Sequence, residues 1–304
     1  MADADDGATH PLRVLMFGAT GQVATELRRL AAAAPEKLTL TALDRAAADL
    51  SDPQACARAV AAADVDAVIN AAAYTNVDKA ESEEALAETI NAAAPGAMAA
   101  AAAARGLAFA HVSTDFVFDG AATTPQAEDA PVAPLGAYGR TKLSGERAVL
   151  AAHPGAAILR TTRVFAAHGV NWVRSMLRAA ETRPELRVVA DQISGPTAAH
   201  DIAATLLVVA RARARGAGEG GVFHYCAAPL VSMLDFTREM FRLADWAAQP
   251  TILASRTADW PTPAQRPLTP LMDCRKIAAV YGVPQPDWRP ALARVLAELK
   301  ESRE

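Results

Sequence analysis

The sequence predicts an α/β fold in which a doubly wound parallel sheet of the Rossmann type is followed by a smaller C-terminal lobe. Short apolar runs alternate regularly with helix-like segments through the first half of the chain. A glycine-rich turn directly follows the first apolar run, and prolines become frequent beyond about residue 195. With 304 residues, of which 52% are hydrophobic, the chain is long enough for one large domain or for two lobes that share a core.

Four apolar runs in the first half are expected to be buried parallel strands, at residues 12–17, 38–43, 67–72 and 107–113. Helices are expected between them, at residues 22–34, 52–63 and 82–105, the last of them bent near Pro95. Asp52 and Pro53 are a typical N-cap and first helical residue. Because parallel strands need crossover connections, these helices should cover both faces of the sheet.

The second half begins with an irregular segment, residues 115–136, which is rich in proline, glycine and acidic residues. A loop of this length inside a compact domain usually has a function. Beyond it we expect strands at residues 156–161 and 186–190 and helices at residues 137–152, 171–182 and 290–301. No low-complexity linker separates the two lobes, so they should pack as one unit.

Composition excludes several classes of function. The net charge of −4 provides no basic surface for nucleic acid or for an anionic membrane. No apolar stretch reaches the roughly 18 residues that a membrane span needs, and residues 1–10 lack the features of a secretory signal. The cysteines are few and widely spaced, at Cys56, Cys226 and Cys274, which is typical of a reducing cytoplasm rather than of disulfides or a zinc site. We therefore expect a cytoplasmic protein.

The glycine turn Gly18-Ala-Thr-Gly21 lies between an expected strand and an expected helix. Glycines allow the backbone to turn tightly and to approach a pyrophosphate, which then lies at the helix N-terminus. The motif continues Gln-Val-Ala24, so alanine takes the place of the third glycine. In this context the turn predicts a dinucleotide site.

The second strand ends at Asp44, where a carboxylate accepts hydrogen bonds from an adenosine ribose and so favours NAD. Arg45 follows directly and could neutralise the 2′-phosphate of NADP. The sequence therefore leaves the choice between NADH and NADPH open.

Tyr138-Gly-Arg-Thr-Lys142 places a phenol and an ammonium four residues apart, on one face of the expected helix. A free tyrosine has a pKa near ~10 and is a poor acid at neutral pH. A neighbouring cation stabilises the phenolate, so we expect Lys142 to lower the pKa of Tyr138. The pair predicts a proton donor.

Ser113-Thr114-Asp115 stands at the end of the fourth strand, at the sheet edge where parallel sheets bind ligands. A hydroxyl there can bond to an oxygen that gains charge in a reaction. His111, in the same strand, and the other histidines show no metal-ligand spacing, and we expect them to be structural.

Taken together, these motifs resemble the extended short-chain dehydrogenases/reductases. Several longer segments resemble the dTDP-4-dehydrorhamnose reductase family in particular: Phe17-Gly-Ala-Thr-Gly-Gln-Val, Asn70-Ala-Ala-Ala-Tyr-Thr75, Ser113-Thr-Asp-Phe-Val-Phe-Asp-Gly120, Pro134-Leu-Gly-Ala-Tyr-Gly-Arg-Thr-Lys-Leu-Ser-Gly-Glu146 and Asp191-Gln-Ile-Ser-Gly-Pro-Thr197. The resemblance extends from about residue 12 to the C-terminus and is strongest up to Thr197.

The resemblance implies a role for each matching residue. The cofactor would be bound by Gly18, Gly21, Gln22, Val23, Asp44, Arg45, Asp49, Leu50, Ala71, Ala72, Ala73, Tyr74 and Thr75. Tyr138 would protonate the C4 oxygen of a nucleotide-linked keto sugar as NADPH or NADH delivers hydride to C4, with Lys142 on the nicotinamide ribose and Thr114 beside the reacting group. The sugar substrate would be bound by Thr114, Asp115, Arg163 and Arg266.

The sequence departs from the family in three places. Arg163 stands where the family usually has tryptophan, and Pro270 where it has a small polar residue. Some members form a homodimer around Mg²⁺ held by three glutamates. Glu26 and Glu298 match two of these, but His200 stands at the third, and Mg²⁺ prefers oxygen ligands. We therefore name no metal ligand in this sequence, and both Mg²⁺ and a homodimer stay open.

The resemblance implies an NAD(P)-binding Rossmann domain at residues 12–165, after a disordered tail at residues 1–11. Residues 166–304 would form mainly a substrate-binding lobe, with some elements returning to the Rossmann core. The expected activity is the reduction of dTDP-4-dehydro-L-rhamnose to dTDP-L-rhamnose. Two alternatives stay open: a 4-ketoreductase that gives a different product configuration, and a non-catalytic dinucleotide-binding regulatory subunit.

Overall fold

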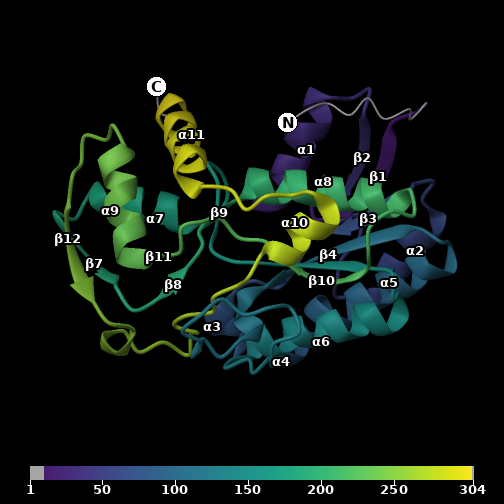
Figure 1. Ribbon diagram of the computed structural model, residues 1–304, viewed down its shortest axis with the longest axis horizontal. Helices are drawn as coiled ribbons and strands as arrows, with labels where there is room; N and C mark the ends of the chain where they lie inside the picture. The colour runs from purple at the N-terminus through teal and green to yellow at the C-terminus, as the bar shows by residue number, and fades with distance from the viewer. Residues whose placement is uncertain (1–9, 303–304) are drawn as a thin grey trace.

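The computed structural model describes residues 10–302. The expectation of a disordered tail at residues 1–11 falls almost entirely outside this range. A parallel sheet of six strands forms the centre of the molecule, in the order β10-β5-β4-β3-β1-β2 (Figure 1). Its strands are β1 (Leu12–Phe17), β2 (Leu38–Leu43), β3 (Ala67–Asn70), β4 (Ala108–Thr114), β5 (Ala157–Thr161) and β10 (Gly221–His224). The α/β prediction is confirmed.

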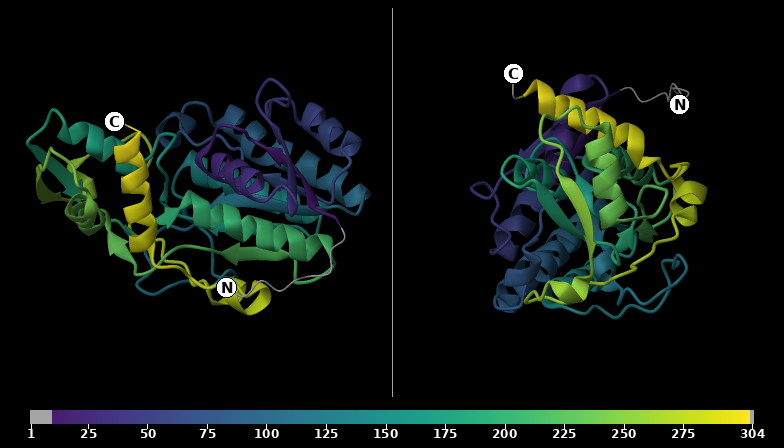
Figure 2. Two further views of the ribbon diagram at one scale, coloured as in Figure 1. Left: turned by 90° about the horizontal axis from the view of Figure 1, so that it is seen from above. Right: turned by 90° about the vertical axis from the view of Figure 1, so that its left-hand side faces the viewer.

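Helices cover both faces of this sheet (Figure 2). One face packs against α1 (Gln22–Ala33), α8 (Ala199–Ala214) and α10 (Arg275–Tyr281). The other face packs against α2 (Pro53–Ala62), α5 (Ala94–Ala104) and α6 (Ala137–Ala152). Because the strands are buried on both sides, their sequences are continuous apolar runs rather than alternating ones.

The elements of the first half follow the predicted ranges to within about two residues, and two differences have physical causes. The third strand ends at Asn70 rather than at residue 72, because the Asn70 side chain accepts the hydrogen bond of the Ala72 N–H at 3.1 Å and turns the chain. The helical region near Pro95 consists of α4 (Glu84–Glu88), a π-helical segment (Thr89–Ala93) and α5. Proline has no N–H to donate to the preceding turn, which favours such an irregularity.

The segment 115–136 is irregular as expected, apart from a 3-10 turn at Asp115–Val117. It is held by the C-terminal part of the chain. The Thr269 N–H donates to the Gly120 carbonyl at 2.9 Å, and the Gln126 N–H donates to the Leu271 carbonyl at 2.9 Å. The loop is therefore anchored at two points to the segment around residues 269–271.

The smaller lobe has its own core of apolar side chains. It contains α7 (Trp172–Ala180), β7 (Glu185–Val189), α9 (Met233–Leu243), β12 (Thr251–Ser255) and α11 (Trp288–Glu301), with β12 parallel to β7. Short two-residue strands complete it: β8 (Ile193–Ser194) pairs with β11 (Val231–Ser232), and β6 (Val164–Phe165) pairs with β9 (Thr197–Ala198). Between these elements the chain returns to the large domain as α8, β10 and α10 (Figure 1). Within residues 10–302 there is no helix long and apolar enough to span a membrane.

Candidate active site

A cavity of about 490 Å³ opens where the strand order reverses, at the carboxyl ends of β1 and β3. Open parallel sheets bind their ligands at this switch point. Ten of the residues predicted to bind the cofactor line the cavity: Gly18, Gly21, Asp44, Arg45, Asp49, Leu50, Ala71, Ala72, Ala73 and Thr75. Six further residues line it, Ala19, Thr20, Leu43, Ala46, Ala48 and Ile90, of which Ala19 and Thr20 lie inside the glycine turn and were recognisable from that motif.

Two glycines shape the phosphate end of this cavity. Gly18 has a φ of +97°, and a Cβ on it would lie 3.3 Å from the Ala72 nitrogen, so a larger residue would be strained there. Gly21 is the N-cap of α1, and a Cβ on it would enter open space. The first N–H groups of α1 are thus accessible to an anion, as a pyrophosphate site requires.

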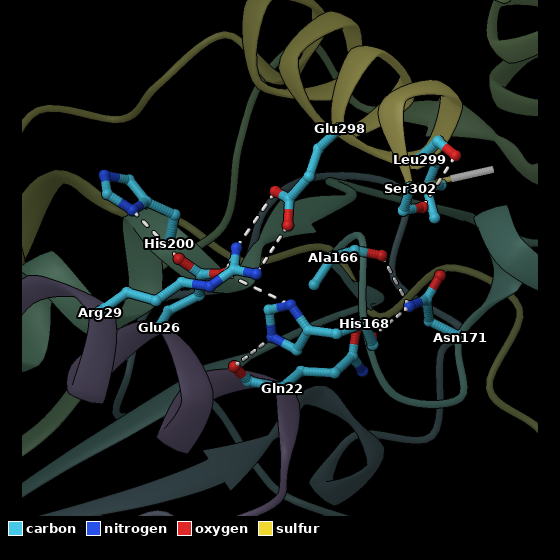
Figure 3. A network of polar contacts seen from close by, with 10 residues as sticks. All are labelled: Gln22, Glu26, Arg29, Ala166, His168, Asn171, His200, Glu298, Leu299 and Ser302. Carbon is cyan, nitrogen blue, oxygen red and sulfur yellow. Dashed lines mark hydrogen bonds and ion pairs between the residues drawn. The ribbon is translucent and has the colours of Figure 1, made fainter. Parts of the chain in front are cut away.

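Gln22 and Val23 are the first two residues of α1, and their side chains have different surroundings. The Val23 side chain is buried in the core, so only its backbone can face a phosphate. The buried Oε1 of Gln22 has no hydrogen-bond partner within residues 10–302. His168 donates through Nε2 to the Gln22 carbonyl at 3.1 Å and thereby ties the small lobe to this helix (Figure 3).

Both charged residues that the sequence predicts at the adenosine end of the cavity are found there. Asp44 is exposed and accepts the Ala47 N–H at 2.9 Å. Arg45 is also exposed, and its Nε donates to Asp49 at 2.9 Å. The hydrogen bond from Ser51 and the pairing with Arg45 lower the pKa of Asp49. An acidic and a basic group therefore remain side by side at this rim.

Tyr74 is the one residue of the segment 71–75 that does not line the cavity. Its hydroxyl donates to Glu83 at 2.7 Å, and its N–H donates to Asn91 Oδ1 at 2.8 Å. Its ring packs against the same cluster of Ala80, Ala87 and Ala137 as the ring of Tyr138. Tyr74 thus connects the cofactor cavity to the proton-donor helix.

Helix α6 presents Tyr138 next to the end of β4, where Phe116 packs edge-on against the Tyr138 ring at a centroid distance of 5.4 Å. The Tyr138 phenol interacts with the Thr114 hydroxyl. Burial raises the pKa of Tyr138 to about 12, against the opposing effect of the Thr114 hydrogen bond. The expectation that Lys142 lowers this pKa is therefore wrong for this state of the protein.

The reason lies in the contacts of Lys142, whose side chain is 1% exposed. Its Nζ donates to the Val112 carbonyl at 2.7 Å and lies 3.2 Å from Nε2 of His111. Burial lowers the pKa of Lys142 to about 8. His111, which was expected to be structural, thus contacts a predicted site residue. Its position in β4, three residues before Thr114, was the only signal in the sequence.

Asp115 and Arg163 lie close enough to interact through their charges. The Asp115 carboxylate accepts the hydroxyls of Thr162 and Thr114. Burial raises its pKa to about 6, although these bonds and the Arg163 charge oppose the change. Burial also lowers the pKa of Arg163 to about 10, with Asp115 opposing.

Arg163 has two further features typical of a ligand-binding residue. Its φ of 43° is unusual for a residue with a side chain. Its Nη1 is buried and has no hydrogen-bond partner in the described part of the chain. Strained backbone and an unsatisfied donor both cost free energy, so a partner for this guanidinium would be a substrate group.

The sequence predicts that Arg266 binds substrate, but in this structure its guanidinium is bound by other groups of the protein. Its guanidinium binds Asp78 through two hydrogen bonds, of 3.0 and 2.8 Å, and it also bonds to the Ala264 carbonyl. This pairing lowers the pKa of Asp78 and joins the C-terminal segment to α3 (Val77–Ala80). A substrate contact by Arg266 stays a prediction.

The residues at the place of the family's Mg²⁺ site do not fit this ion. Arg29 lies between Glu26 and Glu298, with bonds of 3.2 Å to the first and 2.6 Å to the second (Figure 3). Burial disfavours the charged form of Glu26, but the His200 hydrogen bond at 3.3 Å and the Arg29 charge outweigh it and lower its pKa. A guanidinium already bridges the two carboxylates, and one ligand position is a nitrogen. Among residues 10–302 no cluster of three or more acidic, histidine or cysteine side chains could hold a metal.

The fold and the Tyr-x-x-x-Lys helix beside a glycine turn define an extended short-chain dehydrogenase/reductase. The chain belongs to the family described as RmlD substrate binding domain, whose sequence model matches residues 12–301. A curated dTDP-4-dehydrorhamnose reductase from Burkholderia thailandensis is 40% identical to it, over 95% of this chain and 99% of the relative. The enzyme of the same name from Escherichia coli K12 is 37% identical, over 95% and 98%.

Solved structures agree with this assignment. A dTDP-4-dehydrorhamnose reductase from Clostridium acetobutylicum superposes with a TM-score of 0.88 at 32% identity, covering 95% of this chain and 100% of the other. The enzyme of that name from Bacillus anthracis, solved in complex with NADP, superposes with a TM-score of 0.87 at 29% identity, over 95% and 99%.

Proposed function

We propose that the protein reduces the C4 keto group of a nucleotide-linked 6-deoxy sugar with NADPH or NADH, converting dTDP-4-dehydro-L-rhamnose to dTDP-L-rhamnose. The most direct support is the position of the Tyr138 phenol, which α6 places beside the Thr114 hydroxyl. The glycine turn lies at the same edge of the sheet, where the strands have their carboxyl ends. Relatives with this activity in their names match nearly the whole chain.

The dinucleotide would lie across the switch point of the sheet. The α1 N-terminus at Gly21 and Gln22 would bind its pyrophosphate, and Asp44 or Arg45 would contact the adenosine ribose. Open space at Gly21 fits such a ligand. When bound, the cofactor supplies the hydride.

The reacting carbonyl would be held by the hydroxyls of Tyr138 and Thr114. As hydride adds to C4, the carbonyl oxygen becomes an alkoxide and takes the phenolic proton of Tyr138. A buried phenol with a raised pKa is fully protonated at neutral pH, so the proton is in place before the reaction begins. The products are an alcohol and a phenolate, which must be reprotonated once in each turnover.

Lys142 would hold the nicotinamide ribose and stabilise the phenolate that forms on Tyr138. Asp115 and Arg163 would bind the sugar. The unusual backbone and unsatisfied Nη1 of Arg163 support this assignment, and the small lobe would close the substrate side of the cleft. The free state of Cys56, Cys226 and Cys274 is consistent with a cytoplasmic location.

The primary test is the oxidation of NADPH and NADH by the purified chain with dTDP-4-dehydro-L-rhamnose, followed by absorbance. Formation of dTDP-L-rhamnose with either cofactor would support the proposal, and the configuration at C4 would be determined by NMR. Cofactor binding without turnover of this sugar would contradict it.

Arg163 is also the observation that favours a second candidate, a 4-ketoreductase for another nucleotide sugar. A guanidinium in the sugar site adds a cation and hydrogen-bond donors where the family usually has an indole. Parallel assays with other 4-keto sugar nucleotides would decide. A kcat/KM at least tenfold higher for another sugar than for the rhamnose precursor would favour this second candidate.

A further inference from the structure

Cys226 and Cys274 bring two sulfur atoms into contact in the core of the large domain. The residues are 48 positions apart in the sequence, and their Sγ atoms lie 3.6 Å apart. Both are free thiols, and the residues are 1% and 5% exposed. The Cys226 N–H also donates to Cys274 Sγ at 3.3 Å, so the sulfur of one residue lies against the backbone of the other. The proposed reduction uses neither thiol.

The two cysteines stand where the chain leaves the large domain and where it returns to it. Cys226 follows β10, an edge strand of the central sheet, and Cys274 precedes α10, which packs on that sheet. Between them the chain forms β11, α9 and β12 of the smaller lobe (Figure 1). A bond between the two sulfurs would therefore tie both connections of this part of the smaller lobe to one point of the large domain.

Only a small movement is needed to form this bond. The S–S bond of a disulfide is about 2.05 Å long, so each sulfur would have to move by less than about 1 Å. Rotation of the two side chains can provide a shift of this size while the backbones stay in place. The folded protein thus holds the pair close to the geometry of a disulfide.

The surroundings make the two thiols unequal. The hydrogen bond from the Cys226 thiol lowers the pKa of Cys274 against the effect of burial, and the Cys226 N–H acts in the same direction. The same bond, together with burial, raises the pKa of Cys226. Cys274 therefore loses its proton more readily, and the thiolate is the reactive form of a cysteine.

The side-chain amide of Gln285 covers the pair. Its Nε2 lies 3.6 Å from Cys226 Sγ and 3.9 Å from Cys274 Sγ, and Gln285 is an exposed residue. On this side a single flexible side chain therefore separates the two sulfurs from solvent. Movement of that side chain would admit a molecule as small as hydrogen peroxide.

We propose that Cys226 and Cys274 form a redox modification site, which hydrogen peroxide reaches past Gln285 and converts to a disulfide. The Cys274 sulfur loses its proton and attacks one peroxide oxygen. The O–O bond breaks, the leaving hydroxide takes up the proton as water, and Cys274 becomes a sulfenic acid. The Cys226 thiol then attacks this sulfur, and a second water leaves as the S–S bond forms. In total the two thiols lose two electrons and two protons, and the peroxide is reduced to two molecules of water.

Such a site fits a reducing compartment, where thiol reductants return the pair to the reduced form. Disulfides that form in the cytoplasm are usually transient and are often redox-sensing. A sulfenic acid beside a second thiol condenses with it, whereas one without a partner is open to irreversible oxidation to the sulfinic acid. The pair would thus protect this part of the core from permanent oxidation. The inference does not depend on the proposed function.

The first test is chemical and requires no turnover. The full chain is treated with hydrogen peroxide, the remaining thiols are alkylated, and a digest made without reduction is analysed by mass spectrometry. We expect the peptides of Cys226 and Cys274 to be linked, Cys56 to be alkylated, and dithiothreitol to restore both thiols. Recovery of Cys226 and Cys274 as free thiols, or as sulfinic acids, would overturn the proposal.

The thermal midpoint provides a second readout, because a closed loop of this length restricts the unfolded chain. Peroxide should raise the midpoint by at least about 3 °C, and dithiothreitol should reverse the rise. Cys226→Ala should abolish the rise, and Cys56→Ala, the matched control, should retain it. Cys56 is also a fully buried thiol, but its Sγ contacts the Asp49 carbonyl on the other face of the sheet. A rise that persists in Cys226→Ala, or is lost in Cys56→Ala, would refute the pair as the site.

Gln285→Ala tests the route of the oxidant. The variant should form the disulfide at least about threefold faster at the same peroxide concentration, since the thiols become more accessible. Gln249→Ala is the control, because Gln249 is an exposed glutamine whose amide bonds the carbonyls of Ala244 and Trp246 and not a sulfur. It should react at the rate of the unmodified protein. Equal rates in the two variants would contradict entry past Gln285.

Discussion

Gly139 lies so close to Phe116 that a Cβ on the glycine would be 2.2 Å from the Phe116 carbonyl oxygen. Real Cβ atoms do not approach an oxygen to this distance. The missing side chain therefore allows α6 to rest directly on the segment that follows β4. Because Tyr138 precedes Gly139 and Thr114 precedes Phe116 by two residues, this contact is what brings the phenol and the hydroxyl together.

Gly139→Ala should therefore both destabilise the protein and impair the site. Overpacking of this kind costs about 1–3 kcal/mol, more than the helix propensity of about 1 kcal/mol that alanine adds. We expect a lower midpoint in chemical denaturation and a loss of kcat that exceeds any loss of cofactor affinity. Gly96→Ala in α5 is the control, since its Cβ would lie 3.1 Å from a methyl group, that of Ala148. Equal effects of the two substitutions would show that the approach of Gly139 to Phe116 is not critical.

Tyr138→Phe removes the proton donor with little change in packing. The ring keeps its edge-on contact with Phe116, so folding should be unaffected. We expect kcat to fall by roughly 10²–10⁴, the usual contribution of general acid catalysis. Turnover is measured by NAD(P)H oxidation, and cofactor affinity by fluorescence titration, which should be unchanged within about twofold. A phenylalanine variant with full activity would exclude Tyr138 as the acid.

Asp115→Asn should change how stability depends on pH. Burial raises the pKa of Asp115 from 3.8 to about 6, so between these values the native state binds more protons than the unfolded state. The stabilising contribution of Asp115 to the free energy of unfolding is therefore fully present below about pH 3.8 and is lost as pH rises through about 6. Asparagine does not ionise, so the variant does not lose stability in this way. At pH 7 its free energy of unfolding should be up to roughly 3 kcal/mol higher relative to the parent protein.

The measurement for Asp115→Asn is urea unfolding at a series of pH values from about 4 to 7.5. The difference between variant and parent should grow with pH and then level off. A difference that is constant over this range would show that Asp115 titrates normally. Since Asp115 is proposed to contact the sugar, the same variant should raise the substrate KM while the KM for NAD(P)H stays the same.

Much of the fold could be predicted because the determining signals are local. The range of α6 was predicted correctly, residues 137–152, and the strands of the first half were found because buried parallel strands are continuous apolar runs. The helix α8 was not predicted. It has no side-chain cap at Ala198 and is apolar on several faces, because it is buried against the sheet and α1.

In the site, too, short local motifs could be predicted from the sequence, whereas contacts between distant residues could not. The glycine turn and Tyr138 are visible as short motifs, and the structure places them at one edge of the sheet. The contact of Lys142 with His111 joins residues 31 positions apart, and the bond between Arg266 and Asp78 spans 188 positions. No sequence spacing reports such pairs, so the pKa of Tyr138 and the partner of Arg266 could be read only from the folded chain.

Metal removal should have no effect on this enzyme, in contrast to what a magnesium-bridged relative would show. Arg29 already bonds both Glu26 and Glu298, so its guanidinium stands where a bridging metal ion would bind (Figure 3). We expect EDTA and added Mg²⁺ to leave kcat, the thermal midpoint and the size-exclusion elution volume unchanged. Arg29→Met removes the guanidinium that lies between the carboxylates and keeps an unbranched apolar side chain. Its thermal midpoint should fall by a few degrees at most, since the pair of Arg29 and Glu298 is half-exposed, and it should rise again with millimolar Mg²⁺ only in this variant. A midpoint that falls with EDTA in the unmodified protein would show that the cluster around His200 holds a metal after all.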